Sequence, residues 1–182
     1  MTLREMISHS PRLNARVLEA IQLGHLNGGF EADANPASTG SYNHNTGTLK
    51  VSAATLKGAA SNPEIANSVL MFLGHEVEQA VNKHAIQAGY DRLDAIAQGI
   101  ANGPPPRDYS PAITDFLART RWLVVQGEIA GVNTLAAKIA AGNPGASLGD
   151  LHRALAESTM DAADYFDKSG TASNPAYTPK NG

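Results

Sequence analysis

The feature that most constrains the fold is a long helical segment that starts at the capping run 61–64 and continues to about residue 89. At ~100° per residue its side chains divide between two faces. One face is apolar and should pack on the core, and its members are Leu70, Leu73, Val77 and Val81. The other face carries His75, Gln79 and Asn82, so we expect it to meet solvent or a polar cleft.

Start and stop signals place the other elements. Ser10 and Pro11 form a capping pair, and Gly24 is a good C-terminal stop. Ser147 and Asp150 resemble a capping box. We expect further helices over residues 10–24, 92–98, 110–141 and 147–166, and one strand over residues 48–52 that pairs with the segment around Phe30 or Tyr42.

Length and composition indicate a single globular domain. The chain has 182 residues, of which 42% are hydrophobic and 17% charged, enough to bury a core without disulfides. The expected fold class is mainly α (α+β), a helical domain with a small β-hairpin or short sheet. We expect the domain to cover residues 1–168 and a flexible C-terminal tail to cover 169–182.

Charge and hydropathy exclude several classes of function. The formal charge of -3, without a cluster of Lys or Arg, argues against a nucleic-acid partner. No run approaches the roughly 20 apolar residues of a membrane span, and the N-terminus lacks the apolar core of a signal peptide. We therefore expect a protein that is cytoplasmic or exported by a specialised secretion system. The absence of cysteine excludes thiolate zinc sites and cysteine nucleophiles.

His75 and Glu76 are the candidates for metal chemistry. The zinc motif His-Glu-x-x-His places two imidazoles one helical turn apart, and its Glu activates a water. Here His75 and Glu76 are present, but Gln79 replaces the second His. A solvated helix face would also explain this set of residues.

Glu128 is the candidate third ligand. It lies on an apolar stripe of the helix 110–141 that runs through Ile113, Leu117, Val124 and Leu135. A carboxylate on a buried face is costly unless it is paired or bound to a metal. An ion pair with Arg119 or Arg121 is the competing explanation.

Together these two segments resemble a known family. The run from Phe72 to Asn82 (FLGHEVEQAVN) and the run from Gln126 to Leu135 (QGEIAGVNTL) are similar to the paired helices of zincin-like metallopeptidase domains in bacterial toxins and secreted effectors. The resemblance covers about 35 residues and implies a zinc cofactor. It implies His75 and Glu128 as metal ligands, Glu76 as general base, and Asn82 and Asn133 as supporting residues.

Gln79 departs from the family pattern, and three outcomes are open. Gln79 is itself a weak metal ligand, another histidine completes the site, or catalysis has been lost. His44 is the best replacement, because it precedes the strand that would line the cleft. His25 and His152 are the other histidines considered.

The resulting hypothesis is a zinc-dependent hydrolase that cleaves an amide or peptide bond, a bacterial effector or toxin domain acting on protein or peptidoglycan. An immunity or carrier protein is a further expected partner. The alternative is a catalytically inactive zincin-like helical module that binds a partner protein. A third hypothesis, a peptidoglycan glycosidase using Glu76 and Glu128, leaves His75 without a role.

Overall fold

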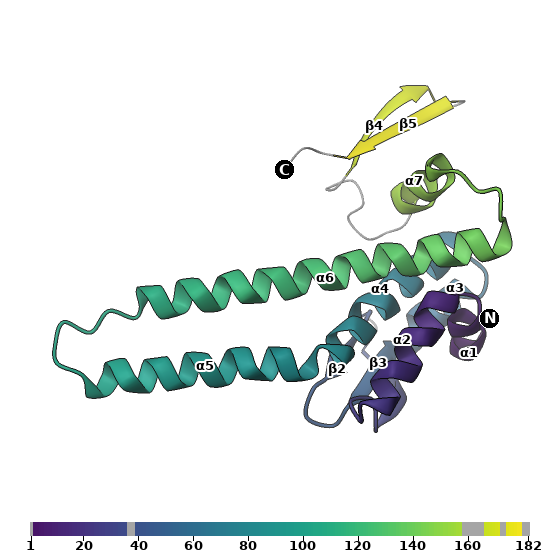
Figure 1. Ribbon diagram of the computed structural model, residues 1–182. Helices are drawn as coiled ribbons and strands as arrows, with labels where there is room; N and C mark the ends of the chain where they lie inside the picture. The colour runs from purple at the N-terminus through teal and green to yellow at the C-terminus, as the bar shows by residue number, and fades with distance from the viewer. Residues whose placement is uncertain (1, 36–38, 158–165, 172–173, 180–182) are drawn as a thin grey trace.

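The computed structural model describes residues 2–35, 39–157, 166–171 and 174–179, with side chains up to residue 156. It is mainly helical with a small three-stranded sheet (Figure 1). The helices are α1 (Leu3–Ser8), α2 (Pro11–Gln22), α3 (Ala53–Ala59), α4 (Pro63–Val81), α5 (Lys83–Asn102), α6 (Ser110–Gly142) and α7 (Leu148–Glu157). The strands are β1 (Gly29–Asp33), β2 (Gly40–Asn43), β3 (Thr48–Ser52), β4 (Phe166–Thr171) and β5 (Asn174–Pro179).

The three-stranded sheet has the order β1-β3-β2. The predicted strand is the central one: Leu49 lies opposite Phe30 in a parallel pair with β1 and opposite Tyr42 in an antiparallel pair with β2. Both predicted pairings are therefore present. Leu49 and Val51 are fully buried, because β3 has a neighbour on each side and packs against the core.

The core forms around α4. Its predicted apolar face is confirmed, since Leu70, Leu73 and Val77 are all buried. The opposite face, which the sequence predicts to meet solvent or a polar cleft, is not open to solvent around His75. Ser68 and Met71, which share that side with His75, are only 4% and 5% exposed, and α6 packs closely along α4. His75 therefore faces a helix rather than bulk solvent.

Glycines allow α4 and α6 to cross in close contact. A Cβ placed on Gly131 of α6 would lie 2.7 Å from the backbone oxygen of Met71 on α4. A Cβ on Gly74 of α4 would lie 2.9 Å from the backbone oxygen of Ala130. Real Cβ atoms do not approach other atoms this closely, so larger side chains at these positions would separate the two helices.

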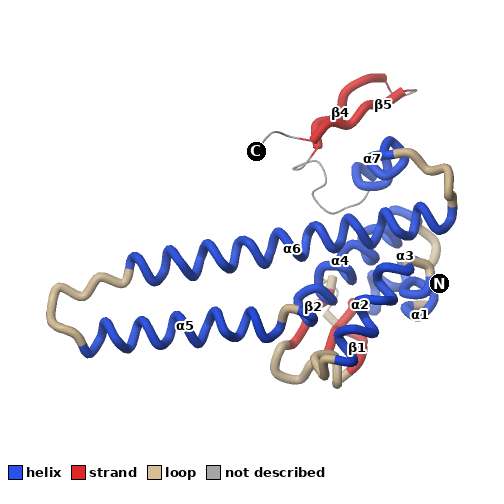
Figure 2. The backbone as a smooth tube through the Cα atoms, in the orientation of Figure 1, coloured by secondary structure: helices blue, strands red, loops and turns tan. Residues whose placement is uncertain are grey.

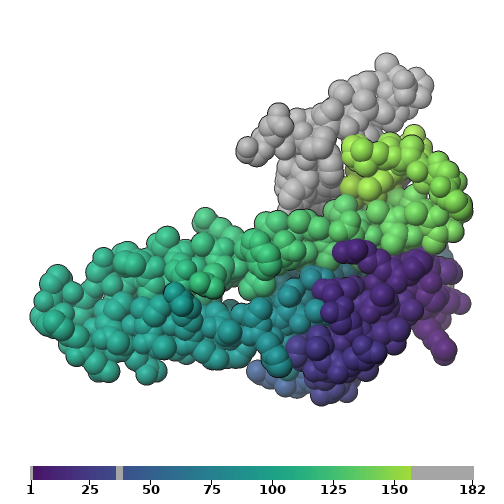
Figure 3. All heavy atoms as spheres, viewed as in Figure 1, coloured from purple at the N-terminus to yellow at the C-terminus, as the bar shows by residue number. Residues whose placement is uncertain are grey.

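α5 and the first half of α6 form an antiparallel pair of helices that projects from the rest of the molecule, and we call this pair the arm (Figures 2 and 3). None of the side chains of α5 is buried. Ile113, Leu117 and Val124, predicted to lie on a buried stripe, are 49%, 44% and 43% exposed. The stripe is thus buried only near its C-terminal end, where Leu135 contacts the core, because the arm has no second layer of helices in the described part of the chain.

The helix boundaries agree with the predicted signals at several ends and differ at others. Ser10 caps α2, and Ser147 and Asp150 form the predicted reciprocal hydrogen bonds before α7. The segment expected to be helical to residue 89 instead breaks at Asn82, where α5 begins in a new direction and extends well beyond the predicted 92–98.

The C-terminal region also differs from the expected picture. The last helix was predicted to run through Phe166, but Phe166 is the first residue of β4, and residues 158–165 lie outside the described residues. Beyond them, β4 pairs antiparallel with β5 where the sequence indicated a flexible tail. None of the described helices combines the length and apolarity needed to cross a membrane.

Candidate functional site

The crossing of α4 and α6 brings His75 and Glu128 together. His75 Nδ1 lies 3.3 Å from Glu128 Oε1, with the two side chains 18% and 29% exposed. Neither arginine considered as an alternative partner pairs with Glu128. Arg119 pairs with Asp115, and no ion pair of Arg121 occurs among the described residues. The polar partner of Glu128 is therefore the histidine of the neighbouring helix.

Gly127 makes room for the imidazole. A Cβ at this position would lie 2.7 Å from His75 Nδ1 and 2.8 Å from its Cε1. The ring thus packs directly on the backbone of α6, next to Glu128. Sequence reasoning did not single out Gly127, although its spacing of four residues from Gly131 is a signal of close helix packing.

The two nitrogens of His75 have different surroundings. Nδ1 is buried and has no hydrogen-bond partner among the described residues, because its 3.3 Å contact with Glu128 does not meet hydrogen-bond geometry. Nε2 lies 3.3 Å from the side-chain amide of Gln79, one turn along α4. Gln79 and Glu128 therefore contact opposite sides of the ring, and they do not converge on one ring nitrogen.

Glu76 points toward the sheet. Its Oε2 accepts a 2.8 Å hydrogen bond from the backbone N–H of Tyr42 in β2, the edge strand of the sheet. No hydrogen bond to its Oε1 occurs among the described residues. Glu76 therefore lies between α4 and β2, near enough to His75 for the charges of the two side chains to interact.

The other candidate histidines lie apart from this contact. His44 stacks edge-on against Tyr42, with ring centroids 4.8 Å apart, and lines a groove together with Gln79. His25 is buried, with Nδ1 2.8 Å from the backbone oxygen of Ala80. His152 is buried on α7. No hydrogen bond or ion pair joins any of them to His75 or Glu128 within the described residues.

The surroundings shift the pKa values of the site in definite directions. The polar contact with Glu128 raises the pKa of His75, and this effect outweighs the burial that favours the neutral ring. Burial raises the pKa of Glu76. Burial and the nearby charge of Lys83 lower the pKa of His44, which favours its neutral form. The site thus holds a carboxyl group and a histidine whose pKa values are both raised.

A second polar contact joins α4 to α2. Arg16 of α2 donates from Nε and Nη2 to the two carboxylate oxygens of Glu78, at 3.0 and 2.6 Å. Asn82 donates to the same carboxylate at 3.1 Å. Asn82, predicted as a supporting residue, thus stabilises the end of α4, while Asn133 is half-buried on α6.

No cluster of three or more His, Asp or Glu side chains that could hold a metal occurs in the part of the chain that the structure describes. The candidate centre is therefore a pair, His75 and Glu128, with Gln79 and Glu76 beside it. Comparison with protein-family models, with curated proteins and with solved structures finds no match to this chain.

Proposed function

We propose that this protein is a zinc-dependent hydrolase of amide bonds, in which His75 Nδ1 and Glu128 Oε1 hold the metal. The observation that carries the proposal is a buried imidazole nitrogen without a hydrogen-bond partner, facing a carboxylate oxygen at 3.3 Å. Two ligands bound to zinc at 2.0–2.1 Å in a tetrahedral arrangement lie about 3.4 Å apart. The residues present therefore fit a shared cation with little rearrangement.

In this proposal Gln79 orients the histidine and is not itself a ligand. A half-turn of its amide places the oxygen next to His75 Nε2, where it accepts the Nε2–H hydrogen bond. That hydrogen bond keeps the proton on Nε2 and leaves the lone pair on Nδ1 for the metal. With only two protein ligands, zinc should bind more weakly than at sites with three.

The chemical roles follow from the placement of each group. Zinc, when bound, supplies a Lewis acid toward a carbonyl group and toward water. Glu76 accepts the proton of the attacking water and returns it to the leaving amine. Its raised pKa suits a proton acceptor that must also act as a donor. The Tyr42 N–H holds Oε2, so that Oε1 is the oxygen available for proton transfer.

The substrate class follows the resemblance to secreted bacterial zincin-like domains, so the bond is an amide in a protein or in the peptides of peptidoglycan. The test is to incubate the zinc-loaded protein with bacterial protein extract and with purified peptidoglycan and to measure newly formed primary amines. Amines should appear, and they should be absent with the Glu76→Gln variant or with a chelator. New reducing ends that persist in chelator would contradict the proposal and favour a glycosidase.

A second candidate function is a catalytically inactive module that binds a partner protein. The exposed apolar side chains of the arm favour it, since Tyr90, Trp122 and Val125 are 51%, 59% and 50% exposed. In that case Glu76→Gln would leave the biological activity unchanged, while polar substitutions at Trp122 and Val125 would abolish it.

A further inference from the structure

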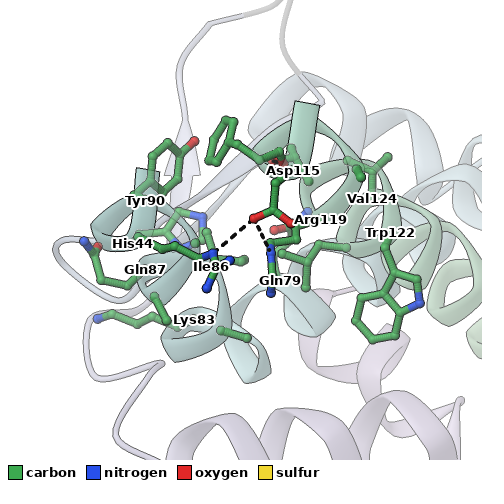
Figure 4. Close-up of a pocket in the computed structure, with 18 residues that line it drawn as sticks. His44, Gln79, Lys83, Ile86, Gln87, Tyr90, Asp115, Arg119, Trp122 and Val124 are labelled. Carbon is green, nitrogen blue, oxygen red and sulfur yellow. Dashed lines mark hydrogen bonds and ion pairs between the residues drawn. The ribbon is translucent and has the colours of Figure 1, made fainter. Parts of the chain in front are cut away.

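A groove of about 860 Å³ runs along the arm between α5 and α6 (Figure 4). Its walls are largely apolar, and they include Ile86, Tyr90, Phe116, Trp122 and Leu123. Such walls suit a ligand that offers apolar side chains along its length.

One end of the groove lies next to the candidate site, although His75, Glu76 and Glu128 do not line it. At the end of the arm nearest α4, the lining of the groove includes Gln79, which contacts His75, and His44, which lies beside Tyr42. A peptide bound along the groove would therefore have one end near His75. That a ligand of this groove is a substrate rests on the proposed hydrolase function.

The charged side chains of the groove are mostly cationic. They are Lys83, Arg92 and Arg119, against the single carboxylate of Asp115. Asp115 Oδ2 accepts from both Arg92 Nε and Arg119 Nε, at 3.1 and 3.0 Å (Figure 4). Lys83 has no ion pair within the described residues. The groove thus carries a local positive charge on a chain whose formal charge is -3, so it would attract an acidic partner.

The spacing of these cations restricts the partner further. Lys83 and Arg92 are nine positions apart on α5, which at ~1.5 Å and ~100° per residue is about 13.5 Å along the helix axis and about half a turn around it. Both side chains nevertheless line the groove. In an extended peptide, residues four positions apart are about 13 Å apart. Two carboxylates at this spacing can meet Lys83 and the arginine cluster at the same time.

We propose that the groove binds an extended acidic peptide segment, with carboxylates about four residues apart and apolar side chains between them, as the substrate of the proposed hydrolase. The carboxylate nearer the site of cleavage pairs with Lys83. The more distant one pairs with Arg92 and Arg119. The apolar side chains between them contact Tyr90, Phe116 and Ile86.

Trp122 provides the readout, since it lines the groove and is the only tryptophan of the chain. The probe is a blocked nonapeptide of alanine and valine with glutamates at its third and seventh positions. It is titrated against the full chain in chelator at low salt, with Trp122 fluorescence followed. Two comparison peptides carry lysines at the same positions or two adjacent glutamates.

The expected result is a saturable fluorescence change with the spaced glutamates, weaker with adjacent glutamates and absent with lysines. Lys83→Glu should weaken binding about tenfold, and high salt should weaken it as well. Asp115→Asn should strengthen binding, because it releases two arginines. Arg12→Glu, an exposed charge reversal on α2 away from the groove, is the matched control and should leave affinity unchanged.

Equal binding of the glutamate and lysine peptides, no saturable change with any peptide, or equal effects of Lys83→Glu and Arg12→Glu would overturn the proposal. The opposite effects expected of Lys83→Glu and Asp115→Asn exclude a general loss of folding as their cause. Because the titration is run without zinc, it separates the two proposals. Peptide binding without zinc-dependent cleavage would end the hydrolase proposal and leave an acidic-peptide site, whereas cleavage without peptide binding would end only the groove proposal.

Discussion

Among single residues, Gly127 has the most direct influence on the candidate metal pair. A Cβ at this position would lie 2.7 Å from His75 Nδ1, and the nearby backbone of α6 leaves little room for the ring to move. Gly127→Ala should therefore displace the imidazole, lower zinc affinity by about 10–100-fold and lower the free energy of unfolding by about 1–3 kcal/mol. Zinc titration and urea unfolding measure the two effects.

The matched control is Gly99→Ala in α5, where an added Cβ would meet no atom within 4 Å. It should leave zinc affinity unchanged and leave stability equal or slightly higher, since alanine favours the helix. Equal zinc affinity in the Gly127→Ala variant and the wild type would show that the ring position does not matter for the metal.

The half-buried carboxyl of Glu76 predicts opposite effects on stability and activity. Burial raises its pKa above 4.5, so its ionised form costs stability as the pH rises through that raised pKa. Glu76→Gln keeps an oxygen for the Tyr42 N–H and removes the charge. At pH 7 the variant should unfold at the same or a higher urea concentration, while amide cleavage falls at least about 100-fold.

For this prediction, Glu64→Gln is the control on the same helix, because Glu64 is exposed in the first turn of α4. It should retain full activity. A Glu76→Gln variant that cleaves as fast as the wild type would remove Glu76 from the mechanism.

The raised pKa of His75 gives two pH dependences of opposite sign. Zinc competes with the proton on Nδ1, so zinc affinity should fall as the pH drops through that pKa. In the metal-free protein, the contact with Glu128 contributes stability that is present below pH 6.5, the ordinary pKa of histidine, and lost as the pH rises through the raised pKa. Glu128→Gln should lower the pKa of His75, measured by NMR of its ring protons. An unchanged titration would mean that Glu128 does not act on the ring.

Among the elements, α4 depends on α2 through the bidentate contact between Arg16 and Glu78. The Glu78 side chain is only 13% exposed, so loss of the arginine leaves a poorly solvated carboxylate. Arg16→Met should lower the free energy of unfolding by about 1–3 kcal/mol, and Glu78→Gln added to it should restore part of the loss. Arg12→Met on the exposed side of α2 is the control. If the double variant is no more stable than Arg16→Met alone, the unpaired charge is not the cause.

The helix ends that the sequence predicted correctly share one property: their signals are local. Ser10 with Pro11, and Ser147 with Asp150, act through hydrogen bonds and backbone preferences within a few residues. The break at Asn82 has no such signal, because no proline or glycine interrupts the pattern there. α5 changes direction there and packs along α6, a tertiary contact that periodicity does not contain.

The same limit applies to the candidate site. The pairing of helix 110–141 with the His75 helix was expected from the resemblance to zincin-like domains. The placement of Glu128 among apolar residues required only some partner, and an arginine of the same helix was the alternative. The exposure of Ile113 and Leu117 was not expected, since an apolar stripe does not reveal whether a second layer covers it. The separate contacts of Gln79 and Glu128 with His75 depend on the rotation of one ring, which no sequence pattern records.

At the scale of the whole molecule, the protein consists of a packed body around α4 and an arm that extends from it (Figures 1 and 3). The residues of α4 from Ala66 to Gly74 are all buried, whereas none of the side chains of α5 is. Amide hydrogen exchange should therefore be slowest in α4 and fastest in α5 among the long helices. Equal protection of both helices would indicate that the arm is covered in solution, as by a second copy or a partner.

The central claim is that His75 and Glu128 share a zinc ion, and calorimetric zinc titration of the chelator-treated chain tests it most directly. The wild type should bind one zinc ion, and His75→Ala and Glu128→Gln should each lose that binding. His9→Ala, which removes an exposed histidine at the end of α1, should bind like the wild type. Zinc uptake that is absent from the wild type, or unchanged in the His75→Ala and Glu128→Gln variants, would contradict the account.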